Sequence, residues 1–142
     1  MTGYHKPRVL IAEDDPDTLV ILRINLTAAG IEPMLAGDGY TALERIDAES
    51  PDAVLLDVLL PGIDGWRVLE QLHAKGDPVP VIVCSGKDNM HDLQRARELG
   101  AVAYLVKPFD IDRLIEVTSE VVGLRQTDPA VERRAAADAE LA

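Results

Sequence analysis

Several side chains suited to phosphate or metal chemistry stand at the ends of short apolar segments in this chain. Glu13 and Asp14 follow one such segment, and Asp57 closes another. Ser85 and Lys107 come at the ends of two more. Three carboxylates brought together would repel one another, and a hard divalent cation such as Mg²⁺ relieves that repulsion. A lysine and a hydroxyl beside them would suit a phosphoryl group in transfer.

The apolar segments have the length and composition of strands that are buried on both faces of a sheet. They cover residues 8–12, 31–36, 53–57, 80–84 and 101–106. Amphipathic helical patterns follow them, each opened by an aspartate that predicts an N-cap. These aspartates are Asp15, Asp38, Asp64, Asp88 and Asp110. Strands and helices that alternate through short connections predict an α/β fold, a five-stranded parallel sheet with helices on both faces. Its ligands are expected at the carboxyl ends of the strands, where the polar side chains above would converge.

Length and composition narrow the class of protein. A chain of 142 residues, 47% hydrophobic and 4% aromatic, is about one domain with an aliphatic core. The net charge of −11 argues against direct binding of nucleic acid, which needs clusters of Lys and Arg. The single cysteine, Cys84, excludes an internal disulfide and fits a reducing compartment. No apolar run reaches the ~20 residues that span a bilayer, so we expect a cytoplasmic protein without membrane insertion.

Short motifs recur at these segment ends in a fixed order. They are Val9–Pro16 (VLIAEDDP), Leu56-Asp57 through Pro61-Gly62 to Gly65, Cys84-Ser85-Gly86, Gly100-Ala101, Tyr104 and Lys107-Pro108-Phe109. From about Arg8 to Gly123 the chain thereby resembles the CheY-like receiver domain of two-component response regulators. The resemblance implies the (βα)5 flavodoxin-like receiver fold. It divides the chain into an N-terminal lead (residues 1–7), a receiver domain (8–124) and a polar tail or start of a linker (125–142).

The resemblance also implies a phosphotransfer function. A histidine kinase or a histidine phosphotransfer protein would transfer a phosphoryl group to Asp57. Glu13, Asp14 and Asp57 would hold Mg²⁺ as acidic ligands, together with the backbone carbonyl of Leu59. We expect a signalling phosphoacceptor rather than a conventional enzyme, one that catalyses only its own phosphorylation and slow dephosphorylation.

Further roles that the resemblance implies concern the response to phosphorylation. Ser85 would bind the phosphoryl group, Lys107 would pair with it, and the Lys107–Pro108 peptide bond is expected to be cis. Ser85 and Tyr104 would form the switch, with Tyr104 turning into the space that Ser85 vacates. The surface of the fourth helix, fifth strand and fifth helix would then bind a downstream protein target or form a phosphorylation-dependent homodimer. Leu59 and Lys87 occupy positions that tune dephosphorylation.

Alternatives differ in how much the sequence supports them. A single-domain response regulator is favoured over the N-terminal receiver of a longer regulator. Winged-helix regulators of the family often carry an acidic pair before the position of Tyr104, where this chain has Val102-Ala103. A haloacid-dehalogenase-type phosphatase is a remote alternative, because it needs a second aspartate two residues after the nucleophile, where Leu59 stands. A nucleotide-binding domain would need a glycine-rich loop after the first strand.

Overall fold

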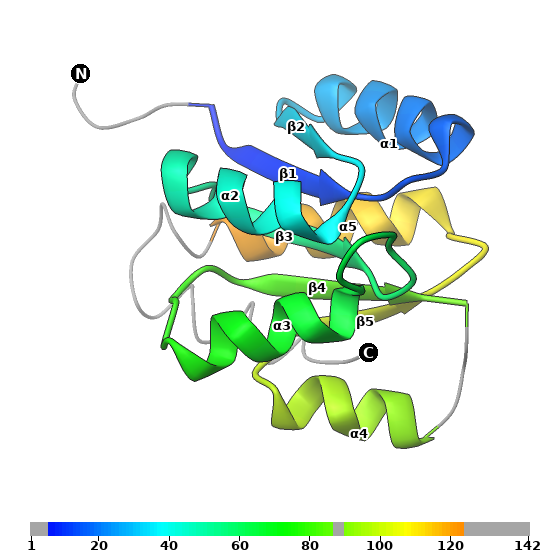
Figure 1. Cartoon of the computed structure of the whole chain (residues 1–142). Coiled ribbons are helices and arrows are strands. Elements are labelled where there is room, and N and C mark those ends of the chain that lie inside the picture. Colours follow the sequence, from blue (N-terminus) through cyan, green and yellow to red (C-terminus); the bar gives the residue numbers. More distant parts are fainter. Residues whose placement is uncertain (1–5, 87–89, 124–142) are drawn as a thin grey trace.

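A parallel sheet of five strands forms the centre of the molecule (Figure 1), and its strand order is β2-β1-β3-β4-β5. The computed structural model describes residues 6–86 and 90–123. Along the chain the elements are β1 (Arg8–Ala12), α1 (Pro16–Ala28), β2 (Glu32–Ala36), α2 (Gly39–Glu49), β3 (Ala53–Asp57), α3 (Gly65–Ala74), β4 (Val81–Ser85), α4 (Met90–Glu98), β5 (Ala103–Val106) and α5 (Ile111–Gly123). All strand pairs are parallel. The flavodoxin-like fold class predicted from the sequence is confirmed.

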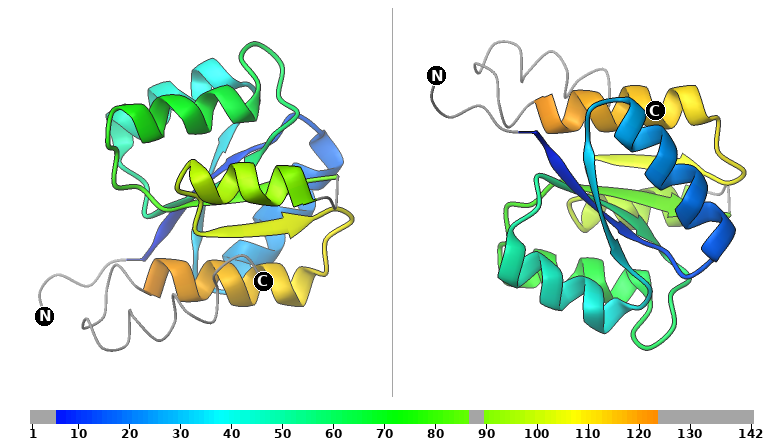
Figure 2. Two further views of the ribbon diagram at one scale, coloured as in Figure 1. Left: turned by 90° about the horizontal axis from the view of Figure 1, so that it is seen from below. Right: turned by 90° about the horizontal axis from the view of Figure 1, so that it is seen from above.

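Helices cover both faces of this sheet (Figure 2). Helices α1 and α5 pack on one face, against strand residues such as Val9, Ile11 and Leu55. Helices α2, α3 and α4 pack on the other, against residues such as Leu10 and Leu56. Successive strand residues point to opposite faces of the sheet. Because helices bury both faces from solvent, the central strands are apolar along most of their length. The sheet is therefore rigid beneath its polar carboxyl ends.

Aspartate caps fix where the helices begin. Asp15, Asp38 and Asp64 each accept a hydrogen bond from the backbone N–H three residues later, as the sequence predicted. Asp110 accepts one from the N–H of Arg113 in the same way. The fourth expected cap, Asp88, lies outside the described residues, where α4 is described from Met90 onward.

Two strands are shorter at their start than the apolar pattern predicted. The N–H of Ile31 donates to the carbonyl of Leu26, and that of Ala101 donates to the carbonyl of Ala96. Each bond closes the preceding helix beyond a glycine with positive φ, a common helix ending in which the next apolar residue packs back on the helix. Both residues are buried, yet they end a helix instead of opening a strand. The fourth strand is shifted by one residue, to Val81–Ser85.

The described part of the chain gives no sign of a membrane span: none of its helices combines the necessary length and apolar character.

Candidate functional site

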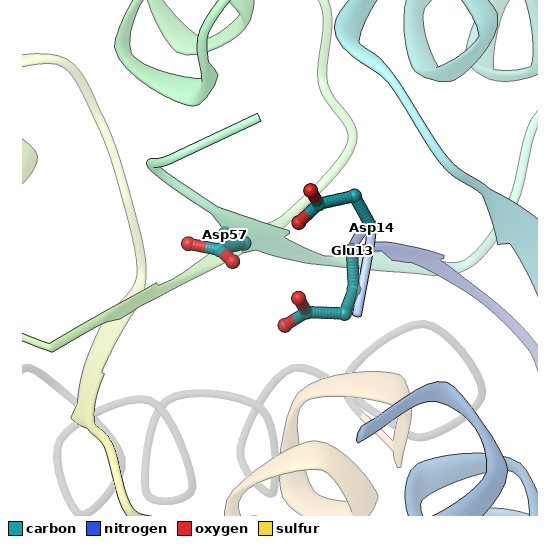
Figure 3. Close-up of side chains that lie close together, drawn as sticks. All are labelled: Glu13, Asp14 and Asp57. Carbon is teal, nitrogen blue, oxygen red and sulfur yellow. The ribbon is translucent and has the colours of Figure 1, made fainter. Parts of the chain in front are cut away.

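Three carboxylates meet at the carboxyl ends of two neighbouring strands. Glu13 and Asp14 follow β1 directly, Asp57 ends β3, and the register pairs Ala12 with Leu56. One carboxylate oxygen from each acid lies within 4.8 Å of the others. Figure 3 shows the three side chains side by side at these strand ends. The convergence predicted from the sequence is therefore present in the fold.

The three acids differ in their exposure to solvent. Glu13 is 3% exposed and Asp57 is 6% exposed, whereas Asp14 is exposed. Two ionisable groups are thus buried side by side, which requires a compensating charge or hydrogen bonds. Asp14 faces the solvent from which a cation would arrive.

Backbone hydrogen bonds hold the acidic segments in place. The N–H of Glu13 donates to the carbonyl of Ala36 at 3.0 Å, which ties the end of β1 to the end of β2. Beyond β3, the N–H of Val58 donates to Cys84 and the N–H of Gly65 donates back to Val58. A side chain cannot replace the hydrogen of Gly65, because a Cβ atom there would lie 2.2 Å from the carbonyl oxygen of Asp57. The turn after Asp57 is consequently fixed by backbone packing.

Lys107 connects the two buried acids. Its Nζ atom lies 2.7 Å from Oε1 of Glu13 and 2.9 Å from Oδ2 of Asp57. The lysine follows β5, its own N–H donates to the carbonyl of Ser85, and its peptide bond with Pro108 is cis, as expected. The sequence assigned Lys107 to a phosphoryl group, and its bond to Glu13 was not anticipated, because residue spacing does not show which acid a long flexible side chain reaches.

The electrostatics of this cluster follow from burial and from these contacts. Burial raises the pKa of Glu13, and the hydrogen bond from Lys107 offsets the rise only in part. For Lys107, burial disfavours the charged form, but the hydrogen bonds to Glu13 and Asp57 outweigh it and raise the pKa above its ordinary value. Lys107 is therefore a cation at neutral pH, held between two buried acids.

The donor set fits a hard divalent cation. The cluster offers carboxylate oxygens, the ligands that Mg²⁺ prefers over nitrogen or sulfur. With all three acids ionised, three carboxylates and the Lys107 ammonium leave two formal negative charges, which one divalent ion would balance. The side chain of Leu59 is 69% exposed beside the cluster, and its N–H donates to Oδ1 of Asp57 at 2.9 Å.

The remaining predicted site residues lie on the two strands beyond Asp57. Ser85 is the last residue of β4, next to β3, and is 1% exposed. Tyr104 lies on β5, paired with Val83, and is 5% exposed within the core beneath α4. Lys87, expected to tune dephosphorylation, lies outside the described residues. The structure thus brings Glu13, Asp14, Asp57 and Lys107 into one cluster, with Ser85 at the adjacent strand end.

Comparison with known proteins identifies the family. The model of the response regulator receiver domain matches residues 9–119, so the chain belongs to the response regulator receiver family. Among solved structures, the receiver domain of the Francisella response regulator 1452 superposes with a TM-score of 0.81 at 30% identity. That match covers 85% of this chain and 99% of the Francisella chain. Both the fold and the family expected from the motifs are therefore confirmed.

Curated relatives are longer than this chain. The transcriptional activator protein IrlR of Burkholderia pseudomallei is 44% identical over 108 residues, which are 76% of this chain and 47% of IrlR. The transcriptional regulatory protein PrrA of Mycobacterium tuberculosis is 40% identical over 114 residues, which are 80% of this chain and 49% of PrrA. The chain spans about half the length of these relatives.

The contacts of Lys107 predict a stability effect that can be measured without phosphorylation. Replacing Lys107 by Gln leaves Glu13 and Asp57 buried without their cation, and should lower the free energy of unfolding in EDTA by about 2 to 4 kcal/mol. Urea denaturation followed by circular dichroism measures the change. The control is Lys75→Gln, whose 3.7 Å pair with Asp47 is exposed and should contribute less than about 0.5 kcal/mol. Equal losses in the two variants would mean that Lys107 does not compensate the buried acids.

The excess negative charge of the cluster predicts that removing the charge of Asp14 stabilises the metal-free chain, whereas removing that of Lys107 destabilises it. Asp14→Asn removes one repelling charge, so the melting temperature in EDTA should rise by roughly 1–3 °C. The same change removes a cation ligand, so the dissociation constant for Mg²⁺ should rise about tenfold or more. Glu44→Gln is the control, because it removes one charge from an exposed position of α2. If both variants melt alike and bind Mg²⁺ alike, Asp14 is not part of the cluster electrostatics.

Proposed function

We propose that this chain is the phosphoacceptor of a two-component signalling system, with Asp57 receiving a phosphoryl group from a histidine kinase or a histidine phosphotransfer protein. The observation that carries the proposal is the position of Asp57: buried at the carboxyl end of a central strand, among two further acids and a lysine. Membership of the receiver family supports the same assignment. Two of the relatives, IrlR and PrrA, are named as a transcriptional activator and a transcriptional regulatory protein.

The transfer itself is a displacement at phosphorus. A carboxylate oxygen of Asp57 forms the new P–O bond, the P–N bond to the donor histidine breaks, and the imidazole leaves with the electron pair. Oδ1 of Asp57 is held by the N–H of Leu59, and Oδ2 by Lys107, so the nucleophile is oriented before the donor arrives. Lys107 remains beside the reacting oxygens, and its charge balances that of the transferred group.

Magnesium would be held by the carboxylates of Glu13, Asp14 and Asp57 and by the backbone carbonyl of Leu59. When bound, it supplies charge neutralisation for the phosphoryl oxygens. Asp14 would be the ligand on the solvent side of the site, since it is exposed whereas Glu13 and Asp57 are buried.

The response to phosphorylation would pass from Ser85 to Tyr104. Ser85 ends the strand beside Asp57 and would donate its hydroxyl to a phosphoryl oxygen. Tyr104 lies on the next strand and would turn inward, which reshapes the α4-β5-α5 face for a downstream protein target. In this structure Tyr104 is buried.

Two forms of output remain to be distinguished. A single-domain regulator acts by binding a protein target, and Val102-Ala103 in place of an acidic pair favours this form. A receiver joined to an output domain is the second candidate, because IrlR and PrrA are about twice the length of the match. Whether the native gene continues past Ala142 separates these two forms. A pull-down with beryllofluoride-treated chain, together with size-exclusion chromatography, then distinguishes a protein target from a homodimer.

The acceptor assignment predicts a single labelled residue. In magnesium and acetyl phosphate, intact-mass spectrometry should show one added phosphoryl group, and peptide mapping should place it on Asp57. Asp57→Asn should lose the label, because an amide is not a nucleophile toward phosphorus. The control, Asp52→Asn, removes a carboxylate at the opposite end of β3 and should be labelled like the wild type. Full labelling of Asp57→Asn would overturn the assignment.

The residues flanking the acceptor predict a long-lived phosphorylated state. Hydrolysis needs a water in line with the P–O bond, and the exposed Leu59 side chain offers it no hydrogen bond. Lys87, at the second tuning position, accepts no proton in its charged form. We therefore expect decay over minutes to hours, and Leu59→Asn with Lys87→Glu should speed it about tenfold, a barrier change of about 1.4 kcal/mol.

Decay of the phosphorylated protein after removal of the donor, in magnesium, measures this rate. Met90→Asn is the control, because Met90 is also an exposed apolar residue, at 76% against 69% for Leu59, and lies on α4 rather than on the loop after Asp57. A wild-type half-life of seconds would contradict the prediction, as would a double variant that decays no faster.

A further inference from the structure

The segment 36–40, which runs from the last residue of β2 to the first residues of α2, contacts both segments that carry the proposed metal ligands. At one end, the carbonyl of Ala36 accepts the N–H of Glu13 at 3.0 Å. At the other end, the N–H of Gly39 donates to the carbonyl of Pro61 at 3.2 Å. Pro61 belongs to the loop 58–64 that begins with Val58 and Leu59, and Figure 1 shows this loop beside the start of α2. One short segment therefore spans the distance between the two sides of the site.

The approach of this segment to the loop is closer than a side chain would permit. A Cβ atom on Gly39 would lie 2.0 Å from the carbonyl oxygen of Ile63 and 2.6 Å from its Cγ1 atom. A Cβ atom on Gly62 would lie 3.0 Å from the ring of Tyr40. The backbone of α2 thus packs directly on the loop, and the Tyr40 ring covers the neighbouring turn.

The segment 36–40 is anchored to the core on both sides of Asp38, whereas loop 58–64 reaches the core with only some of its residues. Asp38 caps α2 through the N–H of Thr41 at 2.7 Å and its hydroxyl at 3.0 Å, and these bonds lower the pKa of Asp38. Ala42 and Ile46 bury the inner side of α2 against the sheet. In loop 58–64, Val58, Leu60 and Ile63 contact the same core cluster, whereas residues 59, 61, 62 and 64 are exposed. At its exposed residues 61 and 62 the loop instead contacts Gly39 and Tyr40.

We propose that Gly39 and Tyr40 are positioning residues for the metal site. They fix loop 58–64, and with it the Leu59 carbonyl, at the correct distance from Glu13 and Asp14. Mg²⁺ requires near-ideal octahedral geometry with short bonds, so a small shift of one ligand loop lowers its affinity. This inference rests on the magnesium binding proposed above. Gly39 and Tyr40 would act on the metal site through loop 58–64, without contacting the ion themselves.

The first test compares Gly39→Ala with Gly37→Ala, using the full chain and MgCl₂ in isothermal titration calorimetry. The added methyl group of Gly39→Ala must displace the loop, and the dissociation constant for Mg²⁺ should rise about tenfold. A methyl group at Gly37, in the same segment, meets no atom within 4 Å and should leave the constant unchanged. At saturating Mg²⁺, the rate of labelling by acetyl phosphate in Gly39→Ala should return toward the wild-type value.

A second pair of variants tests the proposal if Gly39→Ala does not fold. Tyr40 is 65% exposed, so Tyr40→Ala should keep the melting temperature of the metal-free chain while weakening Mg²⁺ binding. Tyr40→Phe retains the ring and should restore the wild-type affinity. Wild-type affinity in Gly39→Ala, or equal affinity in Tyr40→Ala and Tyr40→Phe, would overturn the proposal while the metal site stands. A wild-type chain that binds no Mg²⁺ would instead refute the proposed metal site and the positioning role with it.

Discussion

The pairing of Lys107 with two buried carboxylates holds the centre of the site together. Glu13 and Asp57 are almost fully buried, and such acids are tolerated only when a cation or several hydrogen bonds compensate them. Lys107 supplies that compensation from β5, across β4. Replacing a buried ion pair by apolar residues of similar volume is often neutral or stabilising, so stability alone does not account for this cluster.

The order of the strands explains why these groups meet. Strands β1 and β3 are neighbours in the sheet although a helix, a strand and another helix separate them in the chain. At this point the chain changes the direction in which it adds strands, and open α/β sheets bind their ligands in the crevice formed there. Glu13, Asp14 and Asp57 stand at that crevice, and the rigid apolar strands beneath them hold their backbones at fixed separations.

Local features of the sequence predicted much of this arrangement. Apolar segments and aspartate caps located the helices and strands, and the strand-end acids predicted the cluster. The exact starts of two strands were not predicted, because Ile31 and Ala101 look like strand residues, but their N–H groups donate to carbonyls five residues earlier and complete the preceding helices. Contacts over long sequence distances could not be predicted either. The contact of Gly39 with Ile63 is an example. A glycine can be required for several local reasons, and its presence in the sequence does not show which distant residue it contacts.

Geometry at this site is set by backbone contacts more than by side chains. The N–H groups of Glu13, Gly39 and Gly65 all donate to carbonyls of neighbouring segments. Such bonds are independent of side-chain identity, so surface residues around the site can change while the spacing of its acids persists. Around the site, glycine is needed where backbones approach closely, at Gly39 and Gly65, and where φ is positive, at Gly62. Backbone packing thus determines where the ligand oxygens lie. Exposed side chains such as Leu59 and Tyr40 remain available to adjust the proposed rate of dephosphorylation and the proposed affinity for Mg²⁺.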